Sequence, residues 1–324
     1  MNKQASVLPV VVVSKCLGFA RCRYNGITID DDFVTQLKPY VQYQPVCPEV
    51  EIGLGVPRDP IRIVRKKDSD RLMQPATGRD HTDKMLDFSK EFLISLTGVD
   101  GFFLKSRSPS CGIKDVKIFT TTDKSPAIGK DSGFFGRMVL QRFPHLPVED
   151  EGRMRNFRIR EHFLTKLFTF ARFRTLERTM RALVDFHSAH KLMLMAYHQA
   201  ELRNCGRIVA NQEKLSVGEV FGQYGEHLHK AFASVPRYTS NINVLMHALG
   251  YFKKELSAKE KKFFLTSLER YRTGKIPLSV NLGIVRSWIV RFNETYLEQQ
   301  IYFEPYPEGL VEITDSGRGR NLRK

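Results

Sequence analysis

The sequence predicts an α/β amino-terminal domain with a mostly parallel, Rossmann-like sheet, followed by an all-α carboxy-terminal domain. Two observations carry this prediction. In the first half, β-branched apolar runs alternate with helical patterns, which is typical of a parallel sheet covered by helices. In the second half, apolar residues recur at helical spacing, and no convincing strand follows about Arg155. We therefore expect domains at residues 1–152 and 153–315 and a disordered tail at residues 316–324.

Each expected element of the first domain follows from its pattern and its flanking residues. A β-branched run long enough for a strand buried on both faces comes first, and loop signals follow it. The expected strands are Val7–Val13, Tyr40–Val46, Gly101–Lys105 and a short one near Leu146–Val148. The expected helices are a short one capped by Asp30–Asp32 and ending at Leu37, then Thr82–Leu96 and Phe134–Phe143.

The second domain is predicted from helical stripes and from Gly or Pro turns. Helices are expected over residues 217–233, 258–272 and 283–298, with turns at Gly206, Pro236, Gly274–Pro277 and Pro305–Pro307.

The charge of the chain is strongly basic and unevenly distributed. Its formal net charge is +16, with 22 Lys and Arg against 18 Asp and Glu in residues 1–150 and 29 against 17 in the rest. The second half is therefore expected to make most of the contact with any polyanion. A charge that serves only solubility is the alternative, but it needs no clustering. The clustered candidates for nucleic-acid binding are Arg153, Arg155, Arg158, Arg160, Lys166, Arg172, Arg174 and Arg178. The region of Lys253-Lys254 and Lys259–Lys262 is a second basic patch, and the sequence does not decide between the two.

The sequence also indicates the compartment. No segment approaches the roughly 20 apolar residues of a membrane span, and the early apolar run Leu8–Val13 is too short for a secretory signal. We expect a cytoplasmic protein without membrane contact. In a reducing compartment, its five cysteines are metal ligands, nucleophiles or core residues rather than disulfides. Nothing in the sequence indicates an oligomeric state.

Three of these cysteines, Cys16, Cys47 and Cys111, each follow the carboxyl end of an expected strand. Ligands bind at that edge of an open α/β sheet, so three loops can converge on one point. Their spacing alone leaves three possibilities open. They are plain buried cysteines, they form a closed structural zinc site with Cys22, or they hold an iron–sulfur cubane with one open, Lewis-acidic iron.

Residues beside the cysteines favour a reactive site. Glu49 lies two residues after Cys47, and Ser108 lies three before Cys111. A carboxylate in such a place can act as acid and base, and a hydroxyl can hydrogen-bond a substrate. Ser110 and Lys105, in the same strand-end segment, are further candidates. The alternative for Glu49 is a helix-cap or solvated loop carboxylate.

Several motifs resemble the thiouracil desulfidase family, and the second half resembles a helical domain often fused to it. In the first half they are Ser14-Lys15-Cys16-Leu17-Gly18, Arg23-Tyr24-Asn25-Gly26, Cys47-Pro48-Glu49-Val50 with Gly53-Leu54 and Pro57-Arg58, and Ser108-Pro109-Ser110-Cys111-Gly112. In the second half they include Leu183–Lys191, Asn243–His247 and Tyr271–Leu278. The order of the two domains is similar to that of bacterial desulfidases that return 4-thiouridine in tRNA to uridine.

The resemblance implies a fold, a cofactor and site residues. It implies a [4Fe-4S] cluster held by Cys16, Cys47 and Cys111, with Glu49 and Ser108 as the catalytic pair and tRNA as the partner. Cys22 departs from the smaller family members and is a fourth ligand, a thiol for a sulfur intermediate or, as we favour, a core residue. The competing functions are desulfuration of free thiouracil, or nucleic-acid binding or repair with a structural metal site.

Overall fold

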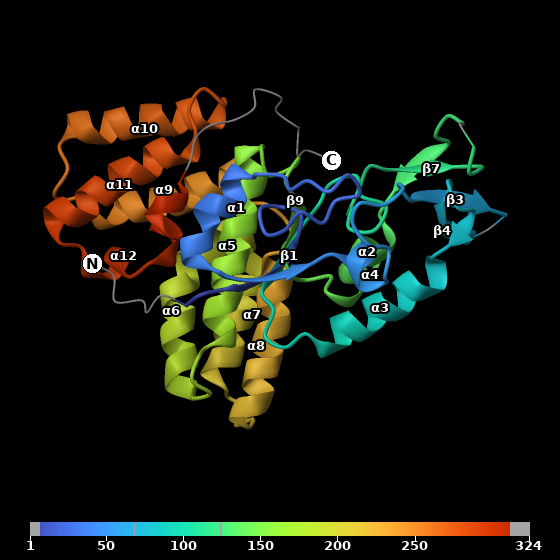
Figure 1. Ribbon diagram of the computed structural model, residues 1–324. Helices are drawn as coiled ribbons and strands as arrows, with labels where there is room; N and C mark the ends of the chain where they lie inside the picture. Colours follow the sequence, from blue (N-terminus) through green and yellow to red (C-terminus); the bar gives the residue numbers. More distant parts are fainter. Residues whose placement is uncertain (1–6, 68, 124, 312–324) are drawn as a thin grey trace. The chain divides into compact units, whose positions relative to one another are not determined.

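The computed structural model describes residues 7–67, 69–123 and 125–311 and divides into two compact units (Figure 1). The α/β unit runs to Arg174 and resumes at Tyr306, whereas the helical unit runs from Thr175 to Pro305. The tail expected at residues 316–324 lies outside the described residues.

The α/β unit is built on a four-stranded parallel sheet, which confirms the predicted fold class. Its strands are β1 (Val10–Ser14), β2 (Gln42–Val46), β6 (Gly101–Leu104) and β9 (Val148–Asp150), in the order β2-β1-β6-β9. The chain moves outward from β1 to β2 and in the opposite direction from β6 to β9. The order therefore reverses between β1 and β6, where the strand-end loops diverge and leave room for a ligand.

Alternate residues of the central strands are buried on opposite faces of this sheet. Val11, Val13 and Phe103 belong to one core, which also contains residues of α1 (Asp32–Leu37) and α5 (Phe157–Arg174). Phe102 and Leu104 belong to a second core with α3 (Thr82–Ser95) and α4 (Phe134–Arg142). Because both faces are covered at the centre of the sheet, β1 and β6 are apolar over almost their whole length.

A second sheet in the α/β unit was not predicted. Its strands are β3 (Arg62–Lys66), β4 (Ser69–Gln74), β5 (Arg79–Asp80), β7 (Val116–Phe119) and β8 (Gly129–Asp131), in the order β5-β4-β3-β7-β8. All pairs are antiparallel except β3 with β7. These strands are short and carry many charges, so they show no clear two-residue period of apolar side chains.

Helix α5 packs with the α/β unit, so the expected boundary at residues 152/153 falls inside that unit. Its Phe163, Leu164 and Leu167 lie in the same core as Val11 and Val13. The chain also returns to this core after the helical unit, through Tyr306 and through Leu310 in η3 (Glu308–Leu310).

The helical unit contains helices and no strand over its described residues 175–305, as expected. Its helices are α6 (Met180–Tyr197), α7 (Gln199–Ala210), α8 (Val217–Ala231), α9 (Tyr238–Tyr251), α10 (Ala258–Arg272), α11 (Leu278–Phe292), α12 (Thr295–Glu298) and η2 (Ile301–Phe303). In Figure 1, α9, α10 and α11 lie together, in agreement with their mutual contacts.

Two expectations for this unit are wrong. Gly206 does not form a turn but lies inside α7, which ends instead at Asn211 in a left-handed conformation. The single helix expected over residues 283–298 is two helices, because Asn293 adopts φ 51° and breaks the run between α11 and α12.

None of the helices in the described part of the chain combines the length and the apolar character that crossing a bilayer requires.

Candidate active site

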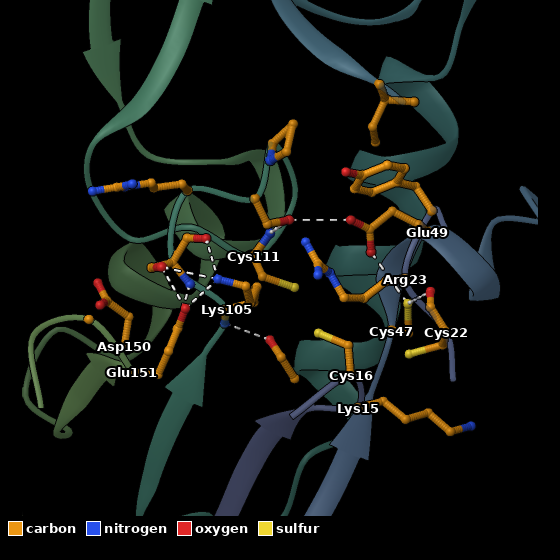
Figure 2. Close-up of a pocket in the computed structure, with 18 of the residues that line it drawn as sticks. Lys15, Cys16, Cys22, Arg23, Cys47, Glu49, Lys105, Cys111, Asp150 and Glu151 are labelled. Atoms are coloured by element: carbon orange, nitrogen blue, oxygen red, sulfur yellow. Dashed lines mark hydrogen bonds and ion pairs between the residues drawn. The ribbon is translucent and has the colours of Figure 1, made fainter. Parts of the chain in front are cut away.

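A cavity of about 560 Å³ lies at the carboxyl end of the parallel sheet (Figure 2). The loops that follow β1, β2, β6 and β9 all contribute to its walls. Four cysteines from three of these loops line it: Cys16, Cys22, Cys47 and Cys111. The structure therefore brings together the three cysteines that were singled out at the strand ends, and it adds Cys22 to them.

The Cys16 loop is fixed by bonds between neighbouring strand ends. Ser14, the last residue of β1, accepts a hydrogen bond at its Oγ from the Lys105 backbone N–H at 2.8 Å. The next residue, Lys15, donates its backbone N–H to the Val46 carbonyl at 2.8 Å. These two hydrogen bonds link the carboxyl ends of β1, β2 and β6 through the two residues that precede Cys16. Cys16 itself is buried.

Cys47 and Glu49 lie at the start of the short helix α2 (Pro48–Glu51). The Cys47 thiol lies 3.5 Å from Glu49 Oε2 and 3.7 Å from the Cys22 carbonyl oxygen, and it donates to these acceptors. Glu49 is 8% exposed, so the carboxyl group is held within the cavity wall rather than in solvent. This position excludes the alternative of a solvated loop carboxylate.

Ser108 joins the Cys111 loop to Glu49. Its hydroxyl donates to Glu49 Oε1 at 3.2 Å and accepts from the backbone N–H groups of Ser110 at 3.2 Å and Cys111 at 3.1 Å. Because the two backbone donors occupy the acceptor sites of the hydroxyl, its proton is directed to Glu49. The structure thus places the two predicted reactive residues in direct contact.

The Cys111 loop packs tightly against the start of α4. The Gly136 N–H donates to the Ser110 carbonyl at 2.9 Å, and a Cβ at Gly136 would lie 2.4 Å from the Gly112 carbonyl oxygen. A residue with a side chain at this position would push the loop away. The close approach therefore fixes the backbone that carries Cys111.

The pKa values of the Cys22, Cys47 and Cys111 thiols are raised. A hydrogen bond with Cys16 is the main cause that raises the pKa of Cys22 to about 11. A hydrogen bond with Cys22, together with burial and the Glu49 carboxylate, raises the pKa of Cys47. Burial, followed by the same carboxylate, raises the pKa of Cys111. Since a metal binds the thiolate, binding at this site must release protons.

Arg58 is a site residue to which the sequence assigned no role, although Pro57-Arg58 is among the motifs that carry the family resemblance. Its Nη1 donates to the Cys22 carbonyl at 2.9 Å and to the Gly55 carbonyl at 3.0 Å, and its Nη2 lies 4.0 Å from Glu49 Oε2. It therefore holds the Cys22 loop and supplies a positive charge near Glu49. No spacing rule in the sequence points to this contact.

The opposite wall contains a second charged group, formed by Lys105, Ser106 and Glu151. Lys105 Nζ forms an ion pair with Glu151, which also accepts from the Ser106 N–H at 2.8 Å and the Ser106 hydroxyl at 2.6 Å. Burial raises the pKa of Glu151, but Lys105 outweighs it and the net shift is downward. Glu151 follows the last parallel strand, so the strand-end rule that singled out the cysteines could have identified it.

The remaining candidates are not all at the cavity. Ser110 is fully buried and does not line the cavity, and its hydroxyl has no hydrogen-bond partner among the described residues.

The residues of the basic stretch have different surroundings. Arg155 lines the cavity, whereas Arg153 pairs with Glu149 and Arg174 pairs with Asp100. Others lie further along the basic stretch: Arg160 donates to the Met154 carbonyl, Arg178 lies over the Phe221 ring, and Arg158, Lys166 and Arg172 lie on α5.

Over residues 7–67, 69–123 and 125–311, no group of three or more His, Cys, Asp or Glu side chains is arranged to hold a single metal ion.

Comparison with known proteins separates the chain into two matched regions. Residues 11–151 match the family described as 2-thiouracil desulfurase, and residues 191–307 match a family described as a protein of unknown function (DUF1722). The uncharacterized protein YbbK of Bacillus subtilis (strain 168) is 32% identical over 115 residues, which cover 73% of that protein and 32% of this chain. The uncharacterized protein YbgA of Escherichia coli (strain K12) is 28% identical over 187 residues, 99% of that protein and 56% of this chain.

Among solved structures, the [4Fe-4S]-dependent thiouracil desulfidase TudS matches with a TM-score of 0.36 and 24% identity, over 45% of this chain and 93% of that chain. On the sequence matches, the chain belongs to the 2-thiouracil desulfurase family through residues 11–151 and carries a DUF1722 region in the same polypeptide.

Proposed function

We propose that this protein is a desulfidase that replaces the sulfur of a thiolated uracil with oxygen, and that its substrate is 4-thiouridine in tRNA. One observation carries the proposal. Cys16, Cys47 and Cys111 come from three separate strand ends and line the same cavity as the Glu49–Ser108 pair. Membership of the 2-thiouracil desulfurase family supports the reaction class.

The donor set fits the [4Fe-4S] cluster that we propose as cofactor. Iron–sulfur clusters are held by cysteine thiolates, and all the sulfur donors here are buried at one cavity. In Figure 2, Cys16, Cys47 and Cys111 are carried by different segments of chain around a common space. These three residues would hold the cluster. When bound, it supplies a soft Lewis-acidic iron without a protein ligand, which prefers a thiocarbonyl sulfur to an oxygen.

Glu49 and Ser108 are placed to manage the protons of the reaction. The overall change is hydrolytic: the thiolated uracil and water give uracil and hydrogen sulfide, with no net transfer of electrons. Glu49 accepts a proton from the attacking water and later returns it to the departing sulfur. The hydrogen bond from Ser108 to Oε1 fixes the orientation of the carboxylate, so that Oε2 carries this proton.

The charge distribution supports tRNA as the partner, and we propose that helix α10 contributes to the contact. Lys259, Lys262 and Arg270 are exposed on one side of this helix, opposite its buried residues, and none of the three forms an ion pair within the described residues. Phe263 lies among them and is 64% exposed. Exposed cations beside an exposed aromatic ring suit a phosphate backbone with an accessible base.

Desulfuration of free thiouracil is the second candidate, because the matching family is described by that base. A small neutral base needs no basic surface, so the net charge of +16 argues for the larger substrate.

The reaction class is tested with anaerobically reconstituted protein and free thiouracil, measuring uracil and sulfide together with bound iron and zinc. We expect equal amounts of uracil and sulfide from the iron-bearing protein and none from Cys111→Ala. A colourless protein that binds zinc and releases no sulfide would instead support nucleic-acid binding with a structural metal site.

A further inference from the structure

The cavity contains one more thiol than the proposed cluster needs. Cys22 is 5% exposed and lines the cavity, and Figure 2 shows it beside Cys47, with Cys16 nearby. Cys22 belongs to an apolar core, as expected from the sequence, and the same core contains Cys16 and Cys47. It therefore shares its surroundings with two of the three cysteines that we assign to the cluster.

The position of Cys22 is fixed by its backbone. Its carbonyl accepts hydrogen bonds from Arg58 Nη1 at 2.9 Å and from the Cys47 thiol at 3.7 Å, and its N–H donates to the Ala20 carbonyl at 2.9 Å. Figure 2 shows the Cys22 and Cys47 sulfurs close together, with Cys16 beside them. The Cys22 backbone is therefore held by two contacts, with Arg58 and with the Ala20 carbonyl, that do not involve the proposed ligands.

Cys111 has a different environment. It is carried by the loop after β6, its backbone N–H donates to the Ser108 hydroxyl at 3.1 Å, and in Figure 2 it lies apart from Cys22. The spare thiol thus adjoins two of the three proposed ligands but not the third. This asymmetry makes the role of Cys22 testable.

We propose that Cys22 is a reserve ligand that binds the cluster in place of Cys16 or Cys47 when either of them is lost as a ligand. This inference rests on the proposed function, because it needs the cluster. In the exchange, the iron–sulfur bond to the departing cysteine breaks, and one to Cys22 forms. The Cys22 thiol releases its proton to solvent. A cysteine that dissociates from the cluster takes up a proton and becomes a thiol. No electron is transferred.

The test uses the full-length chain and measures the cluster itself. Cys16→Ala, Cys47→Ala and Cys111→Ala are each prepared with Cys22 intact and again with Cys22→Ala. All are reconstituted anaerobically, and iron, acid-labile sulfide and visible absorbance are measured per chain. We expect Cys16→Ala and Cys47→Ala to retain most of the iron that wild type binds. When Cys22→Ala is added to either variant, the bound iron per chain should fall about tenfold or more. Cys111→Ala should lose the cluster whether or not Cys22 is present.

The outcomes separate this inference from the proposed function. If wild type holds the cluster and Cys16→Ala and Cys47→Ala lose it as fully as Cys111→Ala, Cys22 is not a reserve ligand, and the desulfidase proposal stands. If wild type holds no cluster, both proposals fail. Parallel Cys16→Ser and Cys47→Ser variants, again with and without Cys22→Ala, preserve the shape of the buried site if an alanine variant does not fold.

Discussion

Glu49 illustrates how single contacts define the site at the residue scale. Its two carboxylate oxygens have different partners, Ser108 at Oε1 and the Cys47 thiol with Arg58 at Oε2. A proton acceptor must be oriented toward the atom on which it acts, and the hydrogen bond from Ser108, which does not depend on the protonation of Cys47, orients the carboxylate. The same contacts join two loops that are separated by almost 60 residues in sequence.

Replacing Glu49 with Gln tests its proton-transfer role. The amide keeps the shape of the side chain but cannot accept and return a proton, so we expect the rate of sulfide release to fall about 10²- to 10⁴-fold. Bound iron should stay at the wild-type level. Glu51→Gln, an exposed position on the same short helix, is the matched control and should keep full activity. Loss of iron along with activity in Glu49→Gln would show a structural role instead.

Glu151 links the site to the pH dependence of stability. Since its pKa is lowered in the folded protein, its ion pair with Lys105 contributes full stability above the ordinary carboxyl pKa. That contribution is lost as the pH falls through the lowered folded pKa. Below about pH 5, wild type should therefore lose more free energy of unfolding than Glu151→Gln.

Urea denaturation at a series of pH values measures this difference. The exposed Glu226→Gln serves as the control, and its stability should follow that of wild type. Identical slopes for wild type and Glu151→Gln below pH 5 would contradict the account.

At the scale of elements, α4 acts as the support for the Cys111 loop. Its first turn donates backbone N–H groups to the loop, from Phe134 to the Pro109 carbonyl at 3.0 Å and from Gly136 to the Ser110 carbonyl at 2.9 Å. Helix α4 and the loop approach so closely that only glycine fits at position 136 of the helix. The position of the Cys111 thiol is therefore set by a helix that lies 23 residues or more further along the chain.

Gly136→Ala tests this close packing. The new Cβ would lie 2.4 Å from the Gly112 carbonyl oxygen, so we expect a loss of about 1–3 kcal/mol in the free energy of unfolding. Gly222→Ala, on α8 with no atom within 4 Å of the added Cβ, is the control and should be neutral or stabilising by up to about 1 kcal/mol. Equal stability of Gly136→Ala and wild type would mean that the loop can move without cost.

Helix α10 provides the test of RNA contact. The double variant Lys259→Gln and Lys262→Gln should weaken tRNA binding and reduce the slope of log K against log salt by about 1–2, because up to two phosphate contacts are removed. Desulfuration of free thiouracil should be unchanged. As a control of equal charge change, Lys84→Gln and Lys90→Gln alter two exposed lysines on α3. If both pairs weaken binding equally, the effect is one of net charge and α10 has no special role.

The elements that sequence predicts well are those with a strong period. The helix expected over residues 258–272 coincides with α10, and Thr82–Leu96 differs from α3 by one residue. The second sheet was not predicted because its strands lack a clear two-residue period of apolar side chains. Strand β3, for example, has three cations in five residues, and only its Ile63 and Val64 are buried. The strand-end rule identifies the three cysteines, but the contacts of Arg58 depend on loop conformations that no local pattern encodes.

At the scale of the whole molecule, the family match and the compact unit end at different residues. The match to 2-thiouracil desulfurase ends at residue 151, whereas the α/β unit continues to Arg174. The additional helix α5 contributes Phe163, Leu164 and Leu167 to the core beneath the sheet. Burying such side chains is worth about 1.5–3 kcal/mol each, so the family segment alone lacks a substantial part of its core.

The measurement that tests the central claim most directly is nucleoside analysis of 4-thiouridine-bearing tRNA after incubation with anaerobically reconstituted protein. Cys111→Ala, treated in the same way, is the control. The account predicts that 4-thiouridine disappears and uridine increases by the same amount only with the cluster-bearing protein. If tRNA is unchanged while free thiouracil is consumed, tRNA is not the substrate. If neither is consumed although iron is bound, the desulfidase assignment is contradicted.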